Sequence, residues 1–583
     1  MQFPFKNLSE RNKLYLLSLL VGLGSGFAAV LLDFVIRLIR DLLTSGFSAV
    51  SSNWLYFVYP GAGMLISYLL VRYVVKDNIG HGVTKVLLAV SRNESRIKPH
   101  NTWSSMLTSS ITIGFGGSVG AEAPIVYTGA AIGSNIGRAF NLSYRSVTTL
   151  LGCGAAGAVA GIFKAPLAGV LFTLEILLFN VSLSSMFPLL LSTVTATVVS
   201  YIFRGQAPVF QATLTQFSMA NLPFYLVLGV ASGFASLYFM RTTLRLEDAF
   251  AKMKKPYVRW LFSAIGLGVL IFFFPQLYGE GYDVVRSLLA GNDVSAEWPL
   301  SFFGNFAWGA PIFFLLVFFF KVIAMTLTNA GGGVGGTFGP TLFAGAILGF
   351  VVSRSINLIF PESIWSVPEQ NFVLVGMAAL MAGVMQAPLT AIFLIAEISG
   401  GYDLLIPLIF TSTISFGTLR IFERYSIYTK RIAQSGDLLT HDSDQAVLTL
   451  MKTDGLIRDK YPRLHPDQTL RELVSVVSET TAGVIAVLDR DGRFRGMVDV
   501  ASIHKMLVSV DKYDKVRVYS LMEQAPAIIY SGEKMEDVMS KFDRTGAWRL
   551  PVVTDDGTYL GFISRSRVLT AYREELKKIS QED

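Results

Sequence analysis

Two short segments far apart in the chain carry one pattern, Gly120-Ala-Glu-Ala-Pro124 and Gly336-Thr-Phe-Gly-Pro340. Each proline is followed, at the same spacing, by a Gly-Ala pair and a further glycine. A second set of residues repeats in the same order and at identical spacing. Gly154, Ala160, Gly161, Pro166 and Glu175 match Gly376, Ala382, Gly383, Pro388 and Glu397. Two independent matches in one order are improbable by chance, so we interpret this region as a tandem structural repeat with halves at roughly 13–204 and 221–434.

The composition of residues 1–434 predicts a polytopic, all-α membrane body. Asp, Glu, Lys and Arg supply 46 of these 434 residues, against 45 of the 149 residues in 435–583. Long apolar stretches approach or exceed the roughly 20 residues that a spanning helix needs. They are Leu14–Ile36, Trp54–Val71, Pro188–Phe203, Leu222–Met240, Leu261–Phe274, Pro311–Phe320 and Leu404–Leu419. The Gly- and Pro-rich segments between them predict broken helices, which in both halves of a membrane protein point to a substrate site.

Charge and cysteine content narrow the class of protein and its cellular compartment. Lys6, Arg11 and Lys13 precede the first apolar stretch, which favours a cytoplasmic N-terminus. The net charge of +7 suggests contact with anionic membrane lipid and not with nucleic acid. A single cysteine excludes a disulfide scaffold, and five scattered histidines argue against a metal site. We expect an integral protein of a bacterial inner membrane, with both termini in the cytoplasm.

Residues 435–583 predict a soluble α/β tail with its own internal repeat. Strands at 484–489 and 550–554 are each followed by an Asp-Gly turn and a second strand, at 496–499 and 561–564. Helical stretches are expected before each unit, at Leu470–Glu479 and Met535–Asp543, and after each, at Val500–Val508 and Ser566–Leu576. This doubled unit resembles a pair of cytoplasmic CBS domains, at roughly 453–510 and 518–578.

The repeated Gly-Pro segments predict helix starts that bind an anion. A helix N-terminus carries unpaired N–H groups and about half a positive charge, and glycines before it let an ion approach the backbone. In an inverted repeat, two such helix starts would aim at a common centre. Glu122 is a lone carboxylate within one of them, and the matching position in the other half is Phe338. We interpret Glu122 as a gate that occupies the anion's own site and leaves it when protonated.

These segments resemble the signatures of the CLC family of chloride channels and chloride/proton antiporters. The resemblance rests on Gly116-Gly-Ser-Val-Gly-Ala-Glu-Ala-Pro124, Gly335-Gly-Thr-Phe-Gly-Pro340 and Ser426-Ile-Tyr-Thr429, and it covers nearly the whole chain. It implies a homodimer with one transport pathway in each subunit. It further implies that Glu122 is the gating glutamate. The anion site that it implies is formed by His81, Gly82, Ala123, Thr337, Phe338 and Tyr428.

The chain departs from the family pattern at several of these positions. His81 replaces a serine hydroxyl, which makes anion affinity dependent on pH if the imidazole contacts the ion. The alternative is a histidine that is turned away, with its backbone N–H binding the anion. Ala121 and Ala123 replace the usual Arg and Gly of the gate segment, which removes a cation from the outer mouth.

The departure at Ile176 decides between two modes of transport. Family antiporters commonly have a second acid there, which hands protons inward, and isoleucine carries no proton. Glu175 lies one residue earlier, about 100° around a helix, and its repeat mate Glu397 suggests a structural role. We therefore expect conduction of chloride or a similar small anion that is channel-like or uncoupled from protons, with chloride/proton antiport as the alternative.

The sequence gives weaker support to three further functions: a serine hydrolase, a magnesium channel and a nucleotide-binding tail. Gly116-Gly-Ser-Val-Gly120 formally matches a serine hydrolase motif but lacks its strand-turn-helix context, so we do not expect an enzyme. A magnesium channel would need clustered pore acids, and the acids here are scattered. CBS pairs often bind adenine nucleotides, which makes one a possible ligand of the tail, although Asp499–Ser502 and Ser564–Arg567 lack the usual Ser-x-x-Asp spacing.

Overall fold

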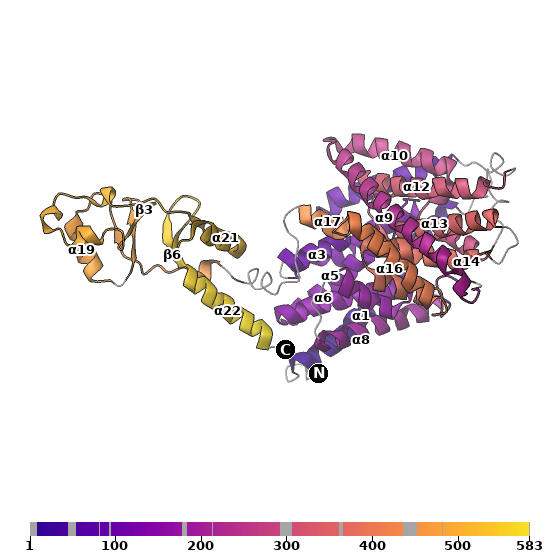
Figure 1. Ribbon diagram of the computed structural model, residues 1–583, viewed down its shortest axis with the longest axis horizontal. Helices are drawn as coiled ribbons and strands as arrows, with labels where there is room; N and C mark the ends of the chain where they lie inside the picture. Colours follow the sequence, from indigo (N-terminus) through magenta and orange to yellow (C-terminus); the bar gives the residue numbers. More distant parts are fainter. Residues whose placement is uncertain are drawn as a thin grey trace. The chain divides into compact units, whose positions relative to one another are not determined.

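The computed structural model describes residues 9–44, 54–77, 79–80, 82–92, 95–177, 183–212, 214–291, 306–360, 365–434, 451, 453–480 and 482–581. The chain forms two compact units, Met1–Leu438 and Leu439–Asp583 (Figure 1). Helices make up the described elements of the first unit, the membrane body. The second unit mixes short strands with helices.

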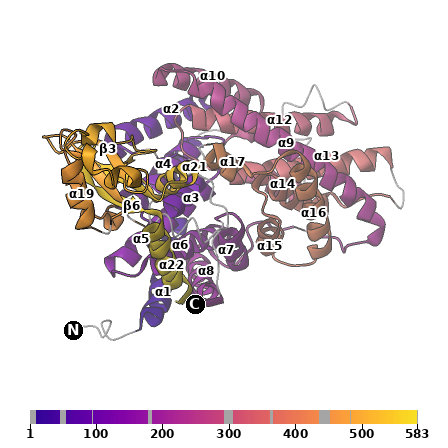
Figure 2. The same ribbon diagram turned by 60° about the vertical axis from the view of Figure 1, so that its left-hand side comes forward.

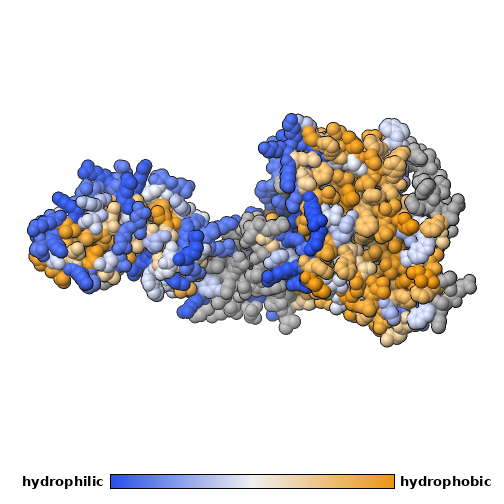
Figure 3. Space-filling model, turned by 45° about the horizontal axis from the view of Figure 1, so that its top comes forward, coloured by the Kyte–Doolittle hydropathy of each residue, from blue (hydrophilic) through white to orange (hydrophobic). Residues whose placement is uncertain are grey.

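The membrane body is built from long apolar helices joined by shorter ones. In chain order they are α1 (Glu10–Thr44), α2 (Leu55–Leu69, continued by a π-helical turn at Leu70–Val75), α3 (Gly82–Arg92), α4 (Ser104–Gly114), α5 (Glu122–Ala139), α6 (Tyr144–Phe163), α7 (Pro166–Glu175), α8 (Leu183–Arg204), α9 (Leu222–Ala251), α10 (Pro256–Phe273), α11 (Tyr282–Leu289), α12 (Gly309–Ala330), α13 (Phe338–Ile359), α14 (Glu369–Met385), α15 (Pro388–Ile398), α16 (Leu405–Phe422) and α17 (Ile427–Gln434). Every apolar stretch expected to span the membrane lies within one of these helices to within a residue. Nine of the described helices are long and apolar enough to cross a membrane. Apolar side chains accordingly cover much of the body's surface (Figure 3).

The helices of the body fall into two groups with the same internal packing. In the first half α1, α6 and α8 pack against one another, and in the second half α9, α14 and α16 do so (Figure 2). The equivalent helices appear in the same order along the chain. The repeat seen in the sequence is therefore a repeat of three-dimensional structure.

The expected helix breaks occur at the repeated prolines. α6 ends in a left-handed residue, Lys164 (φ 58°), and α7 begins two residues later at Pro166. α14 ends in the same way at Gln386 (φ 52°), and α15 begins at Pro388. Proline is favourable at the first helical position and cannot continue a helix from its interior, so each proline both ends and starts a helix.

The repeated glycines let neighbouring helices approach closely. A Cβ atom on Gly129 of α5 would lie 2.1 Å from the carbonyl oxygen of Gly154 on α6. In the second half, a Cβ atom on Gly345 of α13 would lie 2.5 Å from the carbonyl oxygen of Gly376 on α14. Both distances are far below van der Waals contact, so only glycine fits. Close packing through small residues thus explains the glycines of the repeat.

The second unit contains two small sheets of the same topology. Its elements are β1 (Arg463–Leu464), α19 (Leu470–Ser478), β2 (Val484–Leu488), β3 (Phe494–Asp499), α20 (His504–Leu507), β4 (Ile529–Tyr530), α21 (Met535–Thr545), β5 (Arg549–Val553), β6 (Tyr559–Ser564) and α22 (Arg565–Gln581). In each sheet a short first strand pairs parallel with the second, which pairs antiparallel with the third. Each antiparallel pair has an irregularity at the equivalent position, Val487/Leu488 and Val552/Val553.

One expected helix of this unit is much shorter than predicted. The stretch Val500–Val508 is helical only at His504–Leu507. The carboxylate of Asp499 accepts from the backbone N–H of Ala501 at 3.0 Å, and the Ser502 hydroxyl donates to the Asp499 carbonyl at 2.9 Å. Such local side-chain bonds compete with helix formation and hold residues 500–503 in turns.

Candidate functional site

The starts of α5 and α13 meet in the interior of the membrane body. Gly120 and Gly336, each two residues before its helix, form an antiparallel bridge with N–O distances of 3.0 and 2.7 Å. The bridge ties together two chain segments more than 200 positions apart and brings the first turns of both helices to one place. Because each turn carries free N–H groups and a positive dipole end, the junction attracts negative charge.

The carboxylate of Glu122 occupies this junction. One oxygen, Oε2, accepts from the backbone N–H of Gly339 in the first turn of α13, at 3.1 Å. The other, Oε1, accepts from the Tyr282 hydroxyl at 2.5 Å. Glu122 is only 2% exposed. A Cβ atom on Gly120 would lie 2.1 Å from Oε2, so the glycine makes room for the carboxylate.

Three of the predicted anion-site residues lie together at the start of α13. Thr337 precedes the helix, and its hydroxyl donates to the Tyr428 hydroxyl of α17 at 3.2 Å. Phe338 is the first residue of α13, and its ring packs against Phe163 and Phe172 at centroid distances of 5.5 and 6.3 Å. These residues are buried. Tyr428 lies about 90 positions after Thr337 in the sequence, and the fold brings the two side chains into contact.

A third helix start packs against the same place. Gly82 is the first residue of α3, and a Cβ atom on it would lie 2.2 Å from the carbonyl oxygen of Ala123 in α5. The predicted positions Gly82 and Ala123 are therefore in direct contact. His81 lies outside the described residues.

Two charged groups that the sequence analysis did not single out lie beside Glu122. The Glu280 carboxylate accepts from the backbone N–H of Ala121 at 3.1 Å. Lys321, which is fully buried, donates to the backbone carbonyls of Gly279 and Glu280 at 2.9 and 3.2 Å. The sequence does contain a signal for Lys321. A lone lysine within the apolar stretch that forms α12 is an ionisable residue at membrane depth, which marks it as a candidate functional residue. Glu280 lay in a short Gly-Glu-Gly segment with no repeat mate to mark it.

The two repeated glutamates hold the broken helices together. Glu175, at the end of α7, accepts from the backbone N–H groups of Leu389 and Thr390 at 3.0 and 2.7 Å and so caps α15. Glu397, near the end of α15, accepts from Leu167 and Ala168 at 3.0 and 2.9 Å and caps α7. This reciprocal capping gives Glu175 the structural role that its repeat mate suggested.

Neither Ile176 nor the hydrolase motif offers further chemistry. Ile176 follows α7 and is 3% exposed, so its apolar side chain fills the interior. Ser118 lies between the helices α4 and α5, where no strand precedes it, and its backbone N–H donates to the Thr328 hydroxyl at 3.1 Å. Within the described residues, no group of three His, Cys, Asp or Glu side chains could hold a metal ion.

Comparisons with known proteins show which families the chain matches. The family described as voltage gated chloride channel matches residues 62–420, and the CBS domain family matches residues 518–574. A putative chloride channel protein ClcB-like of Ralstonia nicotianae is 29% identical over 390 residues, which are 66% of this chain and 87% of the relative. The H(+)/Cl(-) exchange transporter ClcA of Salmonella arizonae is 27% identical over 463 residues, 76% of this chain and 93% of the relative.

Among solved structures, the fold is similar to that of a slow cyanobacterial Cl-/H+ antiporter. The TM-score is 0.63 at 22% sequence identity, with 74% of this chain and 99% of that chain covered. The fold is therefore a helical, multi-span membrane fold shared with that transporter, followed by an α/β region that matches the CBS domain.

Proposed function

This chain belongs to the voltage gated chloride channel family, and within that family of anion transporters we propose that it exchanges chloride, or a similar small anion, for protons. Transport of a solute, and not catalysis, is the activity of this family. The single observation that carries the proposal is the position of the Glu122 side chain. Its carboxylate accepts a hydrogen bond from a backbone N–H at the start of α13, where an anion would bind. A group that competes with the anion when ionised and leaves when protonated links the two fluxes.

The named relatives support exchange over channel-like conduction. The ClcA relatives are named as exchange transporters, although the ClcB-like relative is named a putative channel protein. Ile176 favours conduction without protons, because it cannot carry one, and conduction is therefore the second candidate. For exchange, protons must reach Glu122 by a path that does not use position 176.

The anion-site assignments belong to the same proposal. We assign gating to Glu122, and anion binding to the backbone at Gly82, Ala123, Thr337 and Phe338 together with the Tyr428 hydroxyl. His81 completes the proposed set. Helix-start amides bind an anion without a full positive charge, which suits an ion that must also leave.

Purified protein in liposomes tests the proposal. A chloride gradient should drive protons uphill in the wild type, recorded as chloride efflux together with external pH. In Glu122→Gln, chloride should still move while proton transport falls to the background. Glu369→Gln, an isosteric change at the start of α14, is the matched control and should keep both fluxes. Chloride loss from the wild type without proton movement would establish the channel-like alternative.

The remaining assignments concern assembly and the tail. We propose a homodimer in a bacterial inner membrane, with residues 1–434 as the transport domain, residues 435–583 as the CBS pair and both termini cytoplasmic. The resemblance and the bacterial relatives support this arrangement. Crosslinking in native membranes and accessibility of tags at each end test it.

An adenine nucleotide is the ligand that we propose for the CBS pair. Arg565 donates to Asp543 at 3.0 Å, whereas the buried Nε of Arg567 has no hydrogen-bond partner among the residues that the structure describes and so fits a phosphate oxygen. Addition of ATP or AMP should raise the thermal midpoint of the wild type and not that of Arg567→Gln.

A further inference from the structure

Each of the two equivalent helix starts holds a carboxylate. At the start of α13, the backbone N–H of Gly339 donates to Glu122 at 3.1 Å. At the start of α5, the backbone N–H of Ala121 donates to Oε1 of Glu280 at 3.1 Å. The second carboxylate comes from the turn before α11 and not from either repeat motif. It therefore stands beside the first for a reason that the repeat does not supply.

The turn that carries Glu280 is held by contacts on three sides. The Nζ of Lys321 donates to the backbone carbonyls of Gly279 and Glu280 at 2.9 and 3.2 Å. The N–H of Gly279 donates to the carbonyl of Gly116 at 3.2 Å. Gly281 (φ 89°) packs so closely on α13 that a Cβ atom there would lie 2.5 Å from an aromatic ring of that helix. The Glu280 carboxylate is therefore fixed beside the start of α5.

Lys321 is a buried cation whose charge is not cancelled by these contacts. Its side chain is fully buried, and the oxygens that it reaches belong to neutral carbonyl groups. It also lies over the Phe343 ring, with its Nζ 4.8 Å from the centroid. A buried charge is costly unless opposite charge lies nearby. Lys321 interacts electrostatically with Glu280 and Glu122, and it can offset one of these carboxylates but not both.

One proton makes this cluster of three charged side chains neutral. With Glu122, Glu280 and Lys321 all ionised, one negative charge is in excess, and the phenols of Tyr282 and Tyr428, which also face Glu122, are neutral at ordinary pH. Two neighbouring carboxylates with one cation between them tend to share a proton. Both oxygens of Glu122 accept hydrogen bonds, so Glu122 is the ionised member. Oε2 of Glu280 has no hydrogen-bond partner among the described residues and can carry the proton.

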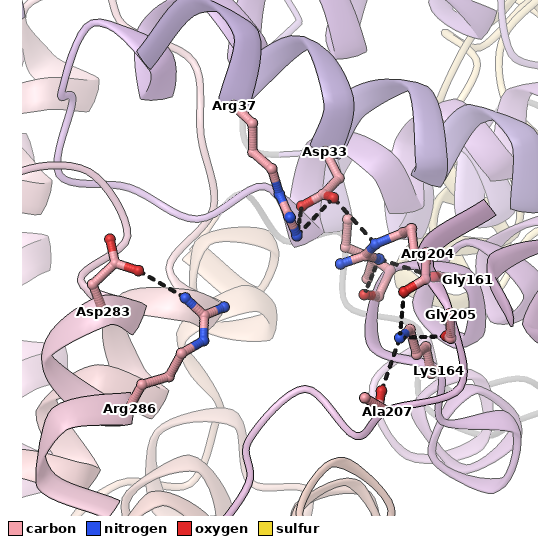
Figure 4. Close-up of polar contacts among 10 residues, drawn as sticks. Asp33, Arg37, Gly161, Lys164, Arg204, Gly205, Ala207, Asp283 and Arg286 are labelled. Carbon is pink, nitrogen blue, oxygen red and sulfur yellow. Dashed lines mark hydrogen bonds and ion pairs between the residues drawn. The ribbon is translucent and has the colours of Figure 1, made fainter. Parts of the chain in front are cut away.

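The charged groups farther from the cluster already have partners of opposite charge. Asp33 lies between Arg37 and Arg204, at 3.0 and 3.1 Å (Figure 4). Arg286 of α11 donates to Asp283 at 2.7 Å (Figure 4). These groups surround the cluster on α1, α8 and α11, and their mutual pairing leaves its proton count unchanged.

We propose that Glu122 and Glu280 share one proton, which Glu280 takes from water and passes to Glu122 as the Glu122 side chain leaves the anion site. In this step the O–H bond of Glu280 breaks and an O–H bond forms on Glu122. Glu280 then becomes the ionised partner of Lys321, so the charge of the cluster does not change. Glu280 is suited to the uptake because it is partly exposed, whereas Glu122 is buried. The inference rests on the proposed function, and it gives protons access to Glu122 on one side of the membrane without Ile176.

The test measures chloride exchange as a function of pH. Radioactive chloride exchange is recorded in liposomes with equal chloride and equal pH on both sides, so the orientation of the protein does not matter. Glu280→Gln keeps an oxygen for the Ala121 N–H but carries no exchangeable acid proton, and Lys321→Gln removes the cation. Glu280→Asp returns an acid to the turn. Asp283→Asn is the matched control, because this nearby acid on α11 is 70% exposed and lies outside the cluster.

The two single glutamine variants should move the pH of half-maximal exchange in opposite directions, each by about one unit. In Glu280→Gln, protonation of Glu122 leaves the charge of Lys321 unbalanced, so exchange requires a lower pH. In Lys321→Gln, the excess negative charge favours the proton on Glu122, so exchange persists to a higher pH. The double variant loses one charge of each sign and should return toward the wild-type midpoint. Glu280→Asp and Asp283→Asn should keep that midpoint.

Proton movement provides the second readout. Uphill proton transport under a chloride gradient should fall at least roughly tenfold in Glu280→Gln and recover in Glu280→Asp. A merely structural role for Glu280 would lower chloride and proton transport together without moving the midpoint.

An unchanged midpoint in Glu280→Gln, or shifts of the same sign in the two single variants, would overturn the shared proton. If Lys321→Gln does not fold, the comparison of Glu280→Gln with Glu280→Asp decides the matter alone. Chloride movement by the wild type without protons would instead overturn the proposed exchange. It would leave the shared proton to be judged by the midpoints, which do not depend on proton transport.

Discussion

Glu175 and Glu397 occupy equivalent positions in the two repeats of the membrane body, and each caps a helix of the other repeat. The starts of α5 and α13 are also equivalent, but Glu122 stands at one and Phe338 at the other. Where both halves need the same stabilisation, the side chain is kept in both. At the proposed anion site, the halves differ. Symmetry between the repeats therefore accompanies the structural contacts, and its loss accompanies the site that we propose for transport.

The strongest test of that contrast exchanges the two bridging glycines for alanine. In Gly120→Ala the new methyl group would lie 2.1 Å from Oε2 of Glu122 and should displace the carboxylate from its seat. In Gly336→Ala it would meet the Cβ atom of Ala123 at 2.8 Å and its backbone nitrogen at 3.0 Å, and the Glu122 carboxylate is not among its nearest atoms. We expect proton-coupled transport to fall about a hundredfold in Gly120→Ala, equal to about 2.7 kcal/mol, and far less in Gly336→Ala. Equal losses in the two variants, measured in liposomes, would contradict the asymmetry.

The packing glycines should respond alike in the two halves. Gly129→Ala and Gly345→Ala each force a methyl group against a backbone carbonyl of the next helix. Overpacking of this kind costs about 2 kcal/mol, slightly more at Gly129, where the approach is closer. Thermal unfolding in detergent should show a lowered midpoint for both. A loss of transport without a loss of stability in either variant would show that the glycines serve the ion pathway.

The capping glutamates should affect stability and leave the transport ratio unchanged. Glu175→Gln and Glu397→Gln each weaken two backbone hydrogen bonds at a helix start, which costs about 1 kcal/mol. Glu175→Gln should cost slightly more, because Glu175 also accepts from the Thr390 hydroxyl. The measurements are the thermal midpoint and the ratio of chloride to protons. A changed ratio in Glu175→Gln alone would identify Glu175 as a proton carrier in place of Ile176.

The smallest effect concerns the repeated Asp-Gly turns of the tail. The backbone N–H of Arg493 and the guanidinium of Arg495 hold the pKa of Asp489 below its usual range. Because the folded pKa is lowered, this stabilisation is present above the unfolded pKa of about 4 and is lost as the pH falls through the folded value. Acidification should therefore lower the protection factors of the turn amides in the wild type, that is, their exchange rates should rise relative to the intrinsic rates at the same pH. In Asp489→Asn these protection factors should be lower at neutral pH and change little on acidification.

The Asp556 turn in the second tail repeat provides the control for this measurement. The Thr554 and Thr558 hydroxyls lower the pKa of Asp556 in the same direction. The amides of this turn should keep their acid response in Asp489→Asn. Loss of the response in both turns would show a general loosening of the tail and not a local effect.

Much of this architecture was already present in the sequence. The spacing of prolines, glycines and glutamates predicted the repeat, the helix breaks and the helix start that carries Glu122, because each of these residues acts through its own backbone or its own charge. The apolar stretches and the charge-poor composition located the membrane body for the same reason. Properties that depend on a residue and its sequence neighbours can be predicted from the sequence before the fold is known. The helix after Val500 was the exception, since short side-chain bonds at Asp499 and Ser502 outweighed its helical propensity.

Contacts between distant segments were decided only by the tertiary structure. Nothing in the spacing of Glu280, Tyr282 and Lys321 connects them with Glu122, yet the fold places all four around one junction. A pocket of the membrane body lined by Arg37, Lys164, Arg204 and Arg286 has the same origin, because these residues come from four separate parts of the chain. The sequence determined which helix starts and which carboxylate the site would use. The packing of two halves against each other determined which other charges surround them, since electrostatic interaction depends on distance in space and not on position along the chain.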